Sequence, residues 1–214
     1  MKKIISVLLT MLLILSLSVT AFAKDTAEQG ENKAVATLSI CSCMSTPVIA
    51  GHTYIYVQNL SDEPIQVGLY EVPVGQGVSV GTLSISVHDG WGIYYNIETY
   101  REPREEHFPQ IWSKTIELDR EGLKKLDKKL DGFVNYWGPF FNCSFFAFAV
   151  WNSVAGDFLV PMVIPVLSHL IVMAVGEKGV LELYKSDPSQ VFKQRGTGKD
   201  AYLEPVGEKT LEIG

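Results

Sequence analysis

The chain has few of the residues that stabilise small exported proteins or bind metals. Its 214 residues include four histidines and three cysteines, Cys41, Cys43 and Cys143. Disulfide-stabilised exported domains usually have more cysteines, and an even number of them. Cys41 and Cys43 are one residue apart, so a bond between them would close a strained ring. A disulfide bond between either one and Cys143 is the remaining alternative. No His or Cys pair has the spacing of a structural zinc site, so we expect no metal and no other cofactor.

Basic residues are also scarce. The chain has 18 Lys and Arg residues against 24 Asp and Glu residues, and two of the basic ones, Lys2 and Lys3, precede residue 24. Residues 24–214 therefore have a net charge of 16 − 24 = −8. Because no basic patch with interleaved aromatic residues occurs, the sequence argues against a nucleic-acid partner. The acidic balance also argues against tight binding to anionic lipid head groups.

Residues 1–23 have the pattern of a secretory signal peptide. Lys2 and Lys3 precede a short apolar run, and Ala21-Phe22-Ala23 forms a small-x-small cleavage site. We expect a secreted or extracytoplasmic protein, most simply a bacterial one. Residues 24–34 are polar and are predicted to be a flexible mature N-terminus, followed by one domain over residues 35–214.

The domain is predicted to be α+β. Period-two patterns of Val, Ile and Tyr predict strands at Val35–Cys43, His52–Gln58, Ile65–Val72, Val78–Val87, Trp91–Glu98 and Val180–Tyr184. Helices are predicted at Asp119–Leu130, from Cys143 onward, and from about Pro165. The apolar stretch Leu159–Val175 contains two prolines and is short for a bilayer, so a buried helix is preferred over the alternative of a membrane span.

Cys143 is the most informative residue. It begins an apolar helical stretch directly after the irregular segment Trp137–Phe141. Unpaired N–H groups and the helix dipole favour negative charge in the first helical turn, and this lowers the pKa of a thiol. The sequence therefore predicts a nucleophilic cysteine, with a buried, inert cysteine as the alternative. His52, at the head of a predicted strand, is the candidate base.

Gly51-His52 before a strand hairpin and a late Asn142-Cys143-x-x-Phe146 opening a helix resemble the circularly permuted papain-like superfamily. This superfamily includes relatives of NlpC/P60 peptidases and lecithin:retinol acyltransferase-like proteins, and the resemblance covers roughly residues 35–155. It implies an antiparallel sheet packed on the cysteine helix, with Cys143 as nucleophile and His52 as base. It also implies a third polar residue that orients the histidine.

The third residue is expected on the strand that returns after the hairpin. A fold about Ser61-Asp62 would place Glu71 opposite His52, and Gln66 and His88 are the alternatives. The backbone N–H of Cys143 is expected to hold the oxyanion. The Asn142 side chain is a second donor or merely a helix cap.

The expected function is hydrolysis of an extracellular amide or ester bond through an acyl-enzyme on Cys143. Cell-wall peptide or lipid is the substrate class suggested by export and by the family resemblance. An acyltransferase would use the same residues. A secreted binding domain of the same fold without activity is the competing class, and the sequence does not predict an oligomeric state.

Overall fold

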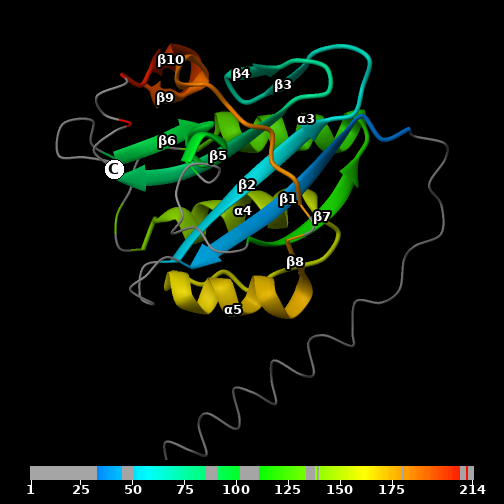
Figure 1. Cartoon of the computed structure of the whole chain (residues 1–214), viewed down its shortest axis with the longest axis vertical. Helices are drawn as coiled ribbons and strands as arrows, with labels where there is room; N and C mark the ends of the chain where they lie inside the picture. The colour runs from blue at the N-terminus through cyan, green and yellow to red at the C-terminus, as the bar shows by residue number, and fades with distance from the viewer. Residues whose placement is uncertain are drawn as a thin grey trace, which may run out of the picture. The chain divides into compact units, whose positions relative to one another are not determined.

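The computed structural model describes residues 33–44, 51–84, 91–101, 111–133, 138, 140–179, 181–207 and 211. Residues 33–214 form one compact unit (Figure 1). The predicted signal peptide, most of the predicted flexible N-terminus, and the histidines at positions 88 and 107 lie outside the described residues.

A large antiparallel sheet is the centre of this unit. Its strands follow the order β10-β9-β6-β5-β2-β1-β7-β8, and every adjacent pair is antiparallel. The strands are β1 (Ala36–Met44), β2 (Gly51–Asn59), β5 (Gly77–Ser84), β6 (Trp91–Tyr95), β7 (Trp112–Leu118), β8 (Glu177–Lys178), β9 (Phe192–Arg195) and β10 (Tyr202–Pro205). β3 (Ile65–Val67) and β4 (Tyr70–Val72) form a separate hairpin. The predicted α+β class with an antiparallel sheet is confirmed.

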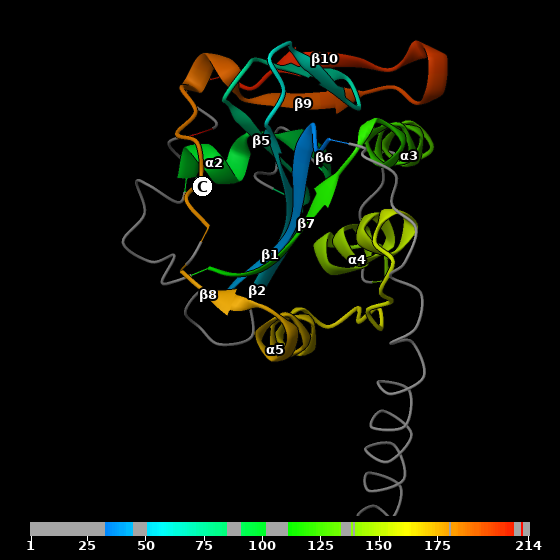
Figure 2. The same cartoon turned by 90° about the vertical axis from the view of Figure 1, so that its right-hand side faces the viewer.

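Helices cover both faces of the sheet. Figure 2 shows α3 and α4 on one side and the short helix α2 on the other. The helices are α2 (Ile97–Arg101), α3 (Arg120–Asp131), α4 (Cys143–Val154) and α5 (Pro165–Val175), with 3₁₀ turns at Pro188–Gln190 and Gly198–Asp200. α4 packs on β2 and β5, whereas α5 packs on β1, β2 and β7.

The alternation of side chains along β2 divides its residues between the two faces. Ile55 and Val57 join the main core, which also contains Phe146 and Trp151 of α4. Tyr54 and Tyr56 point the other way and form a smaller cluster with Cys41. Because both faces are covered, five consecutive residues of β2, Thr53–Val57, are buried, and its position in the sheet is fixed from both sides.

Several helix predictions are confirmed. α3 is capped by Asp119, whose Oδ1 accepts the N–H of Gly122 at 2.7 Å. α4 begins at Cys143, and α5 begins at Pro165. α5 is less buried than predicted, since Leu167 and Leu170 lie on its exposed side. None of the helices in the described ranges combines the length and the hydrophobicity that a membrane crossing needs.

Three local predictions are wrong, and one strand is missed. Residues 65–72 do not return along β2 as one strand, because a turn at Gly68 with φ +56° folds them into the β3–β4 hairpin. The strand predicted to end at Glu98 stops at Tyr95, and α2 follows. β7 was not predicted. Residues 181–184 form no strand, and the C-terminal strands are β9 and β10 instead.

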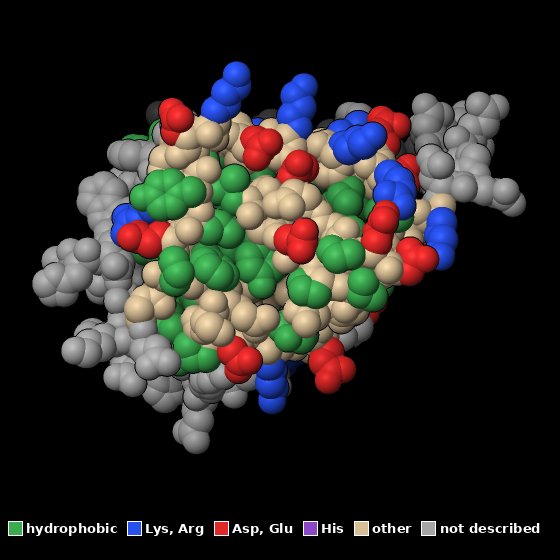
Figure 3. All heavy atoms as spheres, turned by 90° about the horizontal axis from the view of Figure 1, so that it is seen from above, with side chains coloured by type: hydrophobic (Ala, Val, Ile, Leu, Met, Phe, Trp, Pro, Cys, Tyr) green, Lys and Arg blue, Asp and Glu red, His purple; other side chains and the backbone are tan. Residues whose placement is uncertain are grey.

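The face seen from above the view of Figure 1 has a mixed surface. Figure 3 shows hydrophobic side chains in its middle, surrounded by acidic and basic ones. Tyr202 of β10 is 58% exposed, and Arg195 of β9 forms an ion pair with Glu204 of β10. Scattered exposed apolar residues of this kind are normal for a protein surface and indicate no particular site.

Candidate active site

Cys143 is the first residue of α4, as the sequence predicts. The side chain of the preceding residue, Asn142, accepts the N–H groups of Ser144 (3.1 Å) and Phe145 (3.2 Å). The helix therefore begins at a fixed point, with the thiol in its first turn. The residue is 7% exposed, so the thiol is almost enclosed by protein.

His52 lies at the start of β2, where the sheet is split because β2 is no longer paired with β5. The ladder between β2 and β5 extends from Gln58↔Gly77 to Ile55↔Val80, whereas β2 begins four residues earlier, at Gly51. Those first four residues pair with β1 but not with β5. The backbone N–H of Thr53, in this part of β2, acts on the thiol of Cys143 and lowers its pKa. The helix start and the strand start meet at this opening.

The side chains of His52 and Cys143 lie close enough for each to shift the pKa of the other toward the charged form. Burial would lower the pKa of His52, but the adjacent Cys143 thiolate and the Glu98 carboxylate raise it to about 10. Burial would likewise raise the pKa of Cys143, but His52 and the Thr53 N–H lower it below its ordinary value. The two shifts favour a thiolate–imidazolium ion pair at neutral pH.

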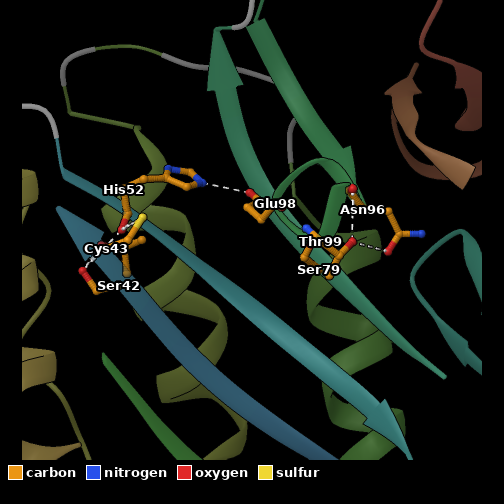
Figure 4. Close-up of polar contacts among 8 residues, drawn as sticks. Ser42, Cys43, His52, Ser79, Asn96, Glu98 and Thr99 are labelled. Carbon is orange, nitrogen blue, oxygen red and sulfur yellow. Dashed lines mark hydrogen bonds and ion pairs between the residues drawn. The ribbon is translucent and has the colours of Figure 1, made fainter. Parts of the chain in front are cut away.

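Glu98 is the acid that orients His52. Its Oε1 lies 2.8 Å from Nε2 of His52, as Figure 4 shows. The Glu98 side chain is 3% exposed and that of His52 is 12% exposed, so the contact is shielded from water. Because Nε2 is engaged by Glu98, Nδ1 is the ring nitrogen left for the thiol. Cys143, His52 and Glu98 thus form a continuous Cys-His-Glu chain of contacts.

A buried network holds α2, and with it Glu98, in place. Asn96 adopts φ 65° and turns the chain from β6 into the helix. Its N–H donates to Ser79 O at 2.8 Å, and Thr99 Oγ1 donates to Asn96 O at 3.1 Å (Figure 4). Thr99 Oγ1 is also 2.8 Å from Ser186 Oγ of the C-terminal segment. These bonds anchor a five-residue helix that is too short to be stable alone.

Gly81 of β5 makes room for the carboxylate. A methyl group at this position would overlap Oε1 of Glu98 and would also press on Cβ of Tyr54. The Tyr54 ring in turn stacks on the His52 ring, with centroids 5.6 Å apart. The glycine therefore lets a buried carboxylate approach the sheet closely enough to reach the histidine.

The third residue predicted from the sequence is corrected by this geometry. Glu71 lies in β4 opposite Gln66, and Val72 beside it accepts a bond from Asn59 at the far end of β2. Seven residues of strand separate Asn59 from His52, which corresponds to about 23 Å. Gln66 is equally remote and bonds to Gly68 O. Glu98 fills the predicted role, because α2 follows β6 and packs on β5, the strand that pairs with β2.

The two predicted oxyanion donors differ in availability. The Nδ2 of Asn142 donates to Val163 O at 2.6 Å, so the side chain ties the start of α4 to the segment before α5. Asn142 accepts the N–H groups of Ser144 and Phe145 but not that of Cys143. The Cys143 N–H belongs to the same residue as the sulfur, so it is the nearer of the two candidate donors to a carbonyl attacked by that sulfur.

Other candidate residues stay outside the Cys-His-Glu chain. All three cysteines are free thiols, and Cys41 and Cys43 are buried in the sheet. His169 of α5 is buried, and its Nδ1 lies 3.1 Å from Ser42 Oγ. Burial lowers the pKa of His169, so its imidazole is neutral. Within the described ranges, no group of three His, Cys, Asp or Glu side chains could hold a metal ion.

No protein-family model matches the chain, and no curated protein or solved structure matches it either. The interpretation of the site therefore depends on its own geometry.

Proposed function

We propose that the protein is a thiol hydrolase that cleaves an amide or ester bond through an acyl-enzyme on Cys143. One observation carries the proposal: a largely enclosed histidine lies beside a thiol at a helix start and bonds on its other side to a buried carboxylate. A nucleophile, a base and a group that orients the base are the parts that acyl transfer requires.

The reaction follows from these positions. The Cys143 thiolate attacks the substrate carbonyl carbon, and the electron pair of the C=O bond moves to the oxygen beside the Cys143 N–H. The tetrahedral intermediate collapses, and the protonated His52 gives its proton to the departing amine or alcohol. Water then attacks the thioester while His52 accepts a proton, and the acid leaves with the thiolate restored. One water molecule is consumed in each cycle.

The geometry also supports the permuted papain-like assignment. The histidine strand precedes the cysteine helix in the chain, the helix packs on an antiparallel sheet, and the acid comes from a third element. The signal pattern of residues 1–23 supports a secreted or extracytoplasmic protein with an extracellular substrate. An acyltransferase would use the same three residues, with an alcohol or amine in place of water.

The pH dependence of Cys143 alkylation by iodoacetamide tests the proposal. Modification is quantified at Cys143 by peptide mass spectrometry, so that the buried Cys41 and Cys43 do not interfere. The rate should rise as the pH passes the lowered pKa of the thiol and stay level until about pH 10, where His52 loses its proton. Between these two pKa values the thiolate and the imidazolium coexist.

The matched variant is His52→Ala. Without the imidazolium, Cys143 loses the adjacent positive charge that offsets its burial. Its pKa should rise, so the rate at pH 7 should fall at least tenfold and recover only above about pH 9. An alkylation profile that is identical in the two proteins would refute the ion pair. It would favour the alternative, a secreted binding domain with an inert thiol.

A further inference from the structure

A cavity of about 390 Å³ lies between the start of α4 and the end of α3, and no step of the proposed hydrolysis uses it. Its described walls are largely aromatic, formed by Phe133, Phe141, Phe145, Phe146 and Ala149. The volume is in the usual range for a small-ligand site. Phe141 is 53% exposed, so one wall of the cavity reaches the protein surface.

The charge of the lining restricts the occupant. Lys129 is the charged side chain among the described lining residues, and its Nζ lies over the Phe133 ring, 5.1 Å from the centroid. No carboxylate occurs among these residues, so nothing there would compensate a cationic ligand. The surroundings favour an apolar group that is buried for most of its length.

The cavity reaches the start of the helix that carries the nucleophile. Asn142, which caps α4 immediately before Cys143, is part of its wall. Thr82 of β5 is another part, and because side chains alternate along a strand it lies on the opposite face of the sheet from Gly81 and Glu98. The cavity therefore begins beside the start of α4 and extends away from it between α3 and α4.

The Thr82 hydroxyl is unusual. It is buried, the residue being 3% exposed, and it has no hydrogen-bond partner in the described part of the chain. Leaving a buried hydroxyl without a partner costs about 1–3 kcal/mol, so such a group is expected to meet a polar atom of a ligand. The polar atom would lie at the catalytic end of an otherwise apolar occupant.

We propose that this cavity binds the acyl chain of the substrate, with the chain in the Phe-lined part and its carbonyl end near Thr82 and Cys143. The inference depends on the proposed hydrolase function and specifies its substrate class as medium-chain acyl esters, amides or thioesters. A methylene group displaces about as much volume as a water molecule, roughly 30 Å³. The cavity therefore holds on the order of ten methylene groups.

The test measures kcat/KM of the purified protein for the 4-nitrophenyl esters of acetate, butyrate, octanoate, decanoate, palmitate and phenylacetate. We expect kcat/KM to rise up to about fourfold per buried methylene and to stop rising near decanoate. Equal values from acetate to decanoate, with Cys143 still acylated, would overturn the acyl-chain site and leave the hydrolase intact. A preference for the phenylacetyl ester over the decanoyl ester would overturn it in favour of an aromatic peptide side chain.

Two variants of α4 localise the effect. Ala149→Phe fills the cavity and should move the optimum to shorter chains, lowering the decanoate-to-butyrate ratio at least tenfold. Ser153→Phe adds the same ring at an exposed position of the same helix that is not among the lining residues, and it should keep the wild-type profile. Identical profiles in the two variants would overturn the assignment to this cavity.

A binding measurement separates the two proposals. Cys143→Ala cannot form an acyl-enzyme but keeps the cavity, so it should bind dansylundecanoic acid with enhanced dansyl fluorescence. Ala149→Phe in that background should weaken binding at least tenfold, and unchanged binding would overturn the cavity assignment. If the wild-type protein binds dansylundecanoic acid but its Cys143 does not react with iodoacetamide, the hydrolase proposal is refuted and the acyl-binding cavity is retained.

Discussion

At the residue scale, three side chains depend on one another. Burial opposes the charged forms of both His52 and Cys143, yet each pKa shifts toward the charged form because the other is adjacent. Glu98 adds a second opposite charge to His52 through Nε2. The ion pair is therefore a property of the three together, and losing any one should alter the other two.

Glu98→Gln should separate the effect of the Glu98 negative charge on catalysis from the effect of its side-chain shape. The glutamine keeps an acceptor oxygen for His52 Nε2 but has no negative charge, so the imidazolium is less stabilised. We expect kcat for an activated ester to fall by about 10²- to 10⁴-fold, as for loss of the orienting acid in other triads. Stopped-flow measurement of product release would give the kcat of the wild type and of Glu98→Gln.

Glu71→Gln is the matched control, because Glu71 lies at the far end of β2 and outside the Cys-His-Glu chain. Its kcat should equal that of the wild type. A larger loss in Glu71→Gln than in Glu98→Gln would contradict the assignment of Glu98.

The identities of His52 and Cys143 could be predicted from the sequence, whereas that of Glu98 could not. A cysteine that opens an apolar helix and a histidine that opens a strand each carry a local pattern. The acid depends on which strand lies beside the start of β2, and that is settled by long-range pairing. The prediction of Glu71 assumed that residues 65–72 pair with β2, but β5 does so instead.

At the element scale, long patterned segments were predictable and short ones were not. The leucine spacing and the Asp119 cap predict α3 because its helical period repeats over three turns. α2 has five residues, too few for a period to show, and it is held by Asn96, Thr99 and Ser79 rather than by its own propensity. The helix that carries Glu98 is therefore one of the elements that could not be predicted from the sequence.

Gly81→Ala should show how closely α2 approaches the sheet. The added methyl overlaps Oε1 of Glu98, so the carboxylate must move away from His52. We expect the free energy of unfolding to fall by about 1–3 kcal/mol, as for other overpacked core positions. The rate of Cys143 alkylation at pH 7 should fall in the same variant. Denaturant titration and the iodoacetamide assay measure the two effects.

Gly156→Ala is the control for this change, since a methyl group there meets no atom within 4 Å. It should leave both the stability and the alkylation rate as in the wild type. Normal alkylation in Gly81→Ala would show that Glu98 does not depend on the space left by this glycine.

At the scale of the whole molecule, the site depends on parts of the chain that are distant in sequence. The C-terminal segment, in which the sequence predicted one strand at Val180–Tyr184, contributes β9 to the sheet beside β6. It also packs on α2, because Ser186 bonds to Thr99 and Gln190 O accepts Nδ2 of Asn96 at 3.0 Å. Residues near position 190 thereby hold an acid at position 98 against a histidine at position 52.

Thr99→Val tests this long-range support. Valine has nearly the shape of threonine but cannot bond to Ser186 Oγ or Asn96 O, so α2 loses its side-chain bond to the C-terminal segment. We expect the free energy of unfolding to fall by about 1–3 kcal/mol, because the buried Ser186 hydroxyl loses a partner. We also expect the rate of Cys143 alkylation at pH 7 to decrease, since Glu98 is held less firmly.

Thr115→Val distinguishes support of the site from a general loss of stability. Thr115 Oγ1 pairs with Ser39 Oγ at 2.8 Å where β7 lies beside β1, so it loses the same kind of hydroxyl pair outside the α2 network. Its alkylation profile should match that of the wild type. If both variants lowered the Cys143 rate equally, the effect would belong to the stability of the sheet as a whole. A selective loss in Thr99→Val would show that the C-terminal segment positions the catalytic acid.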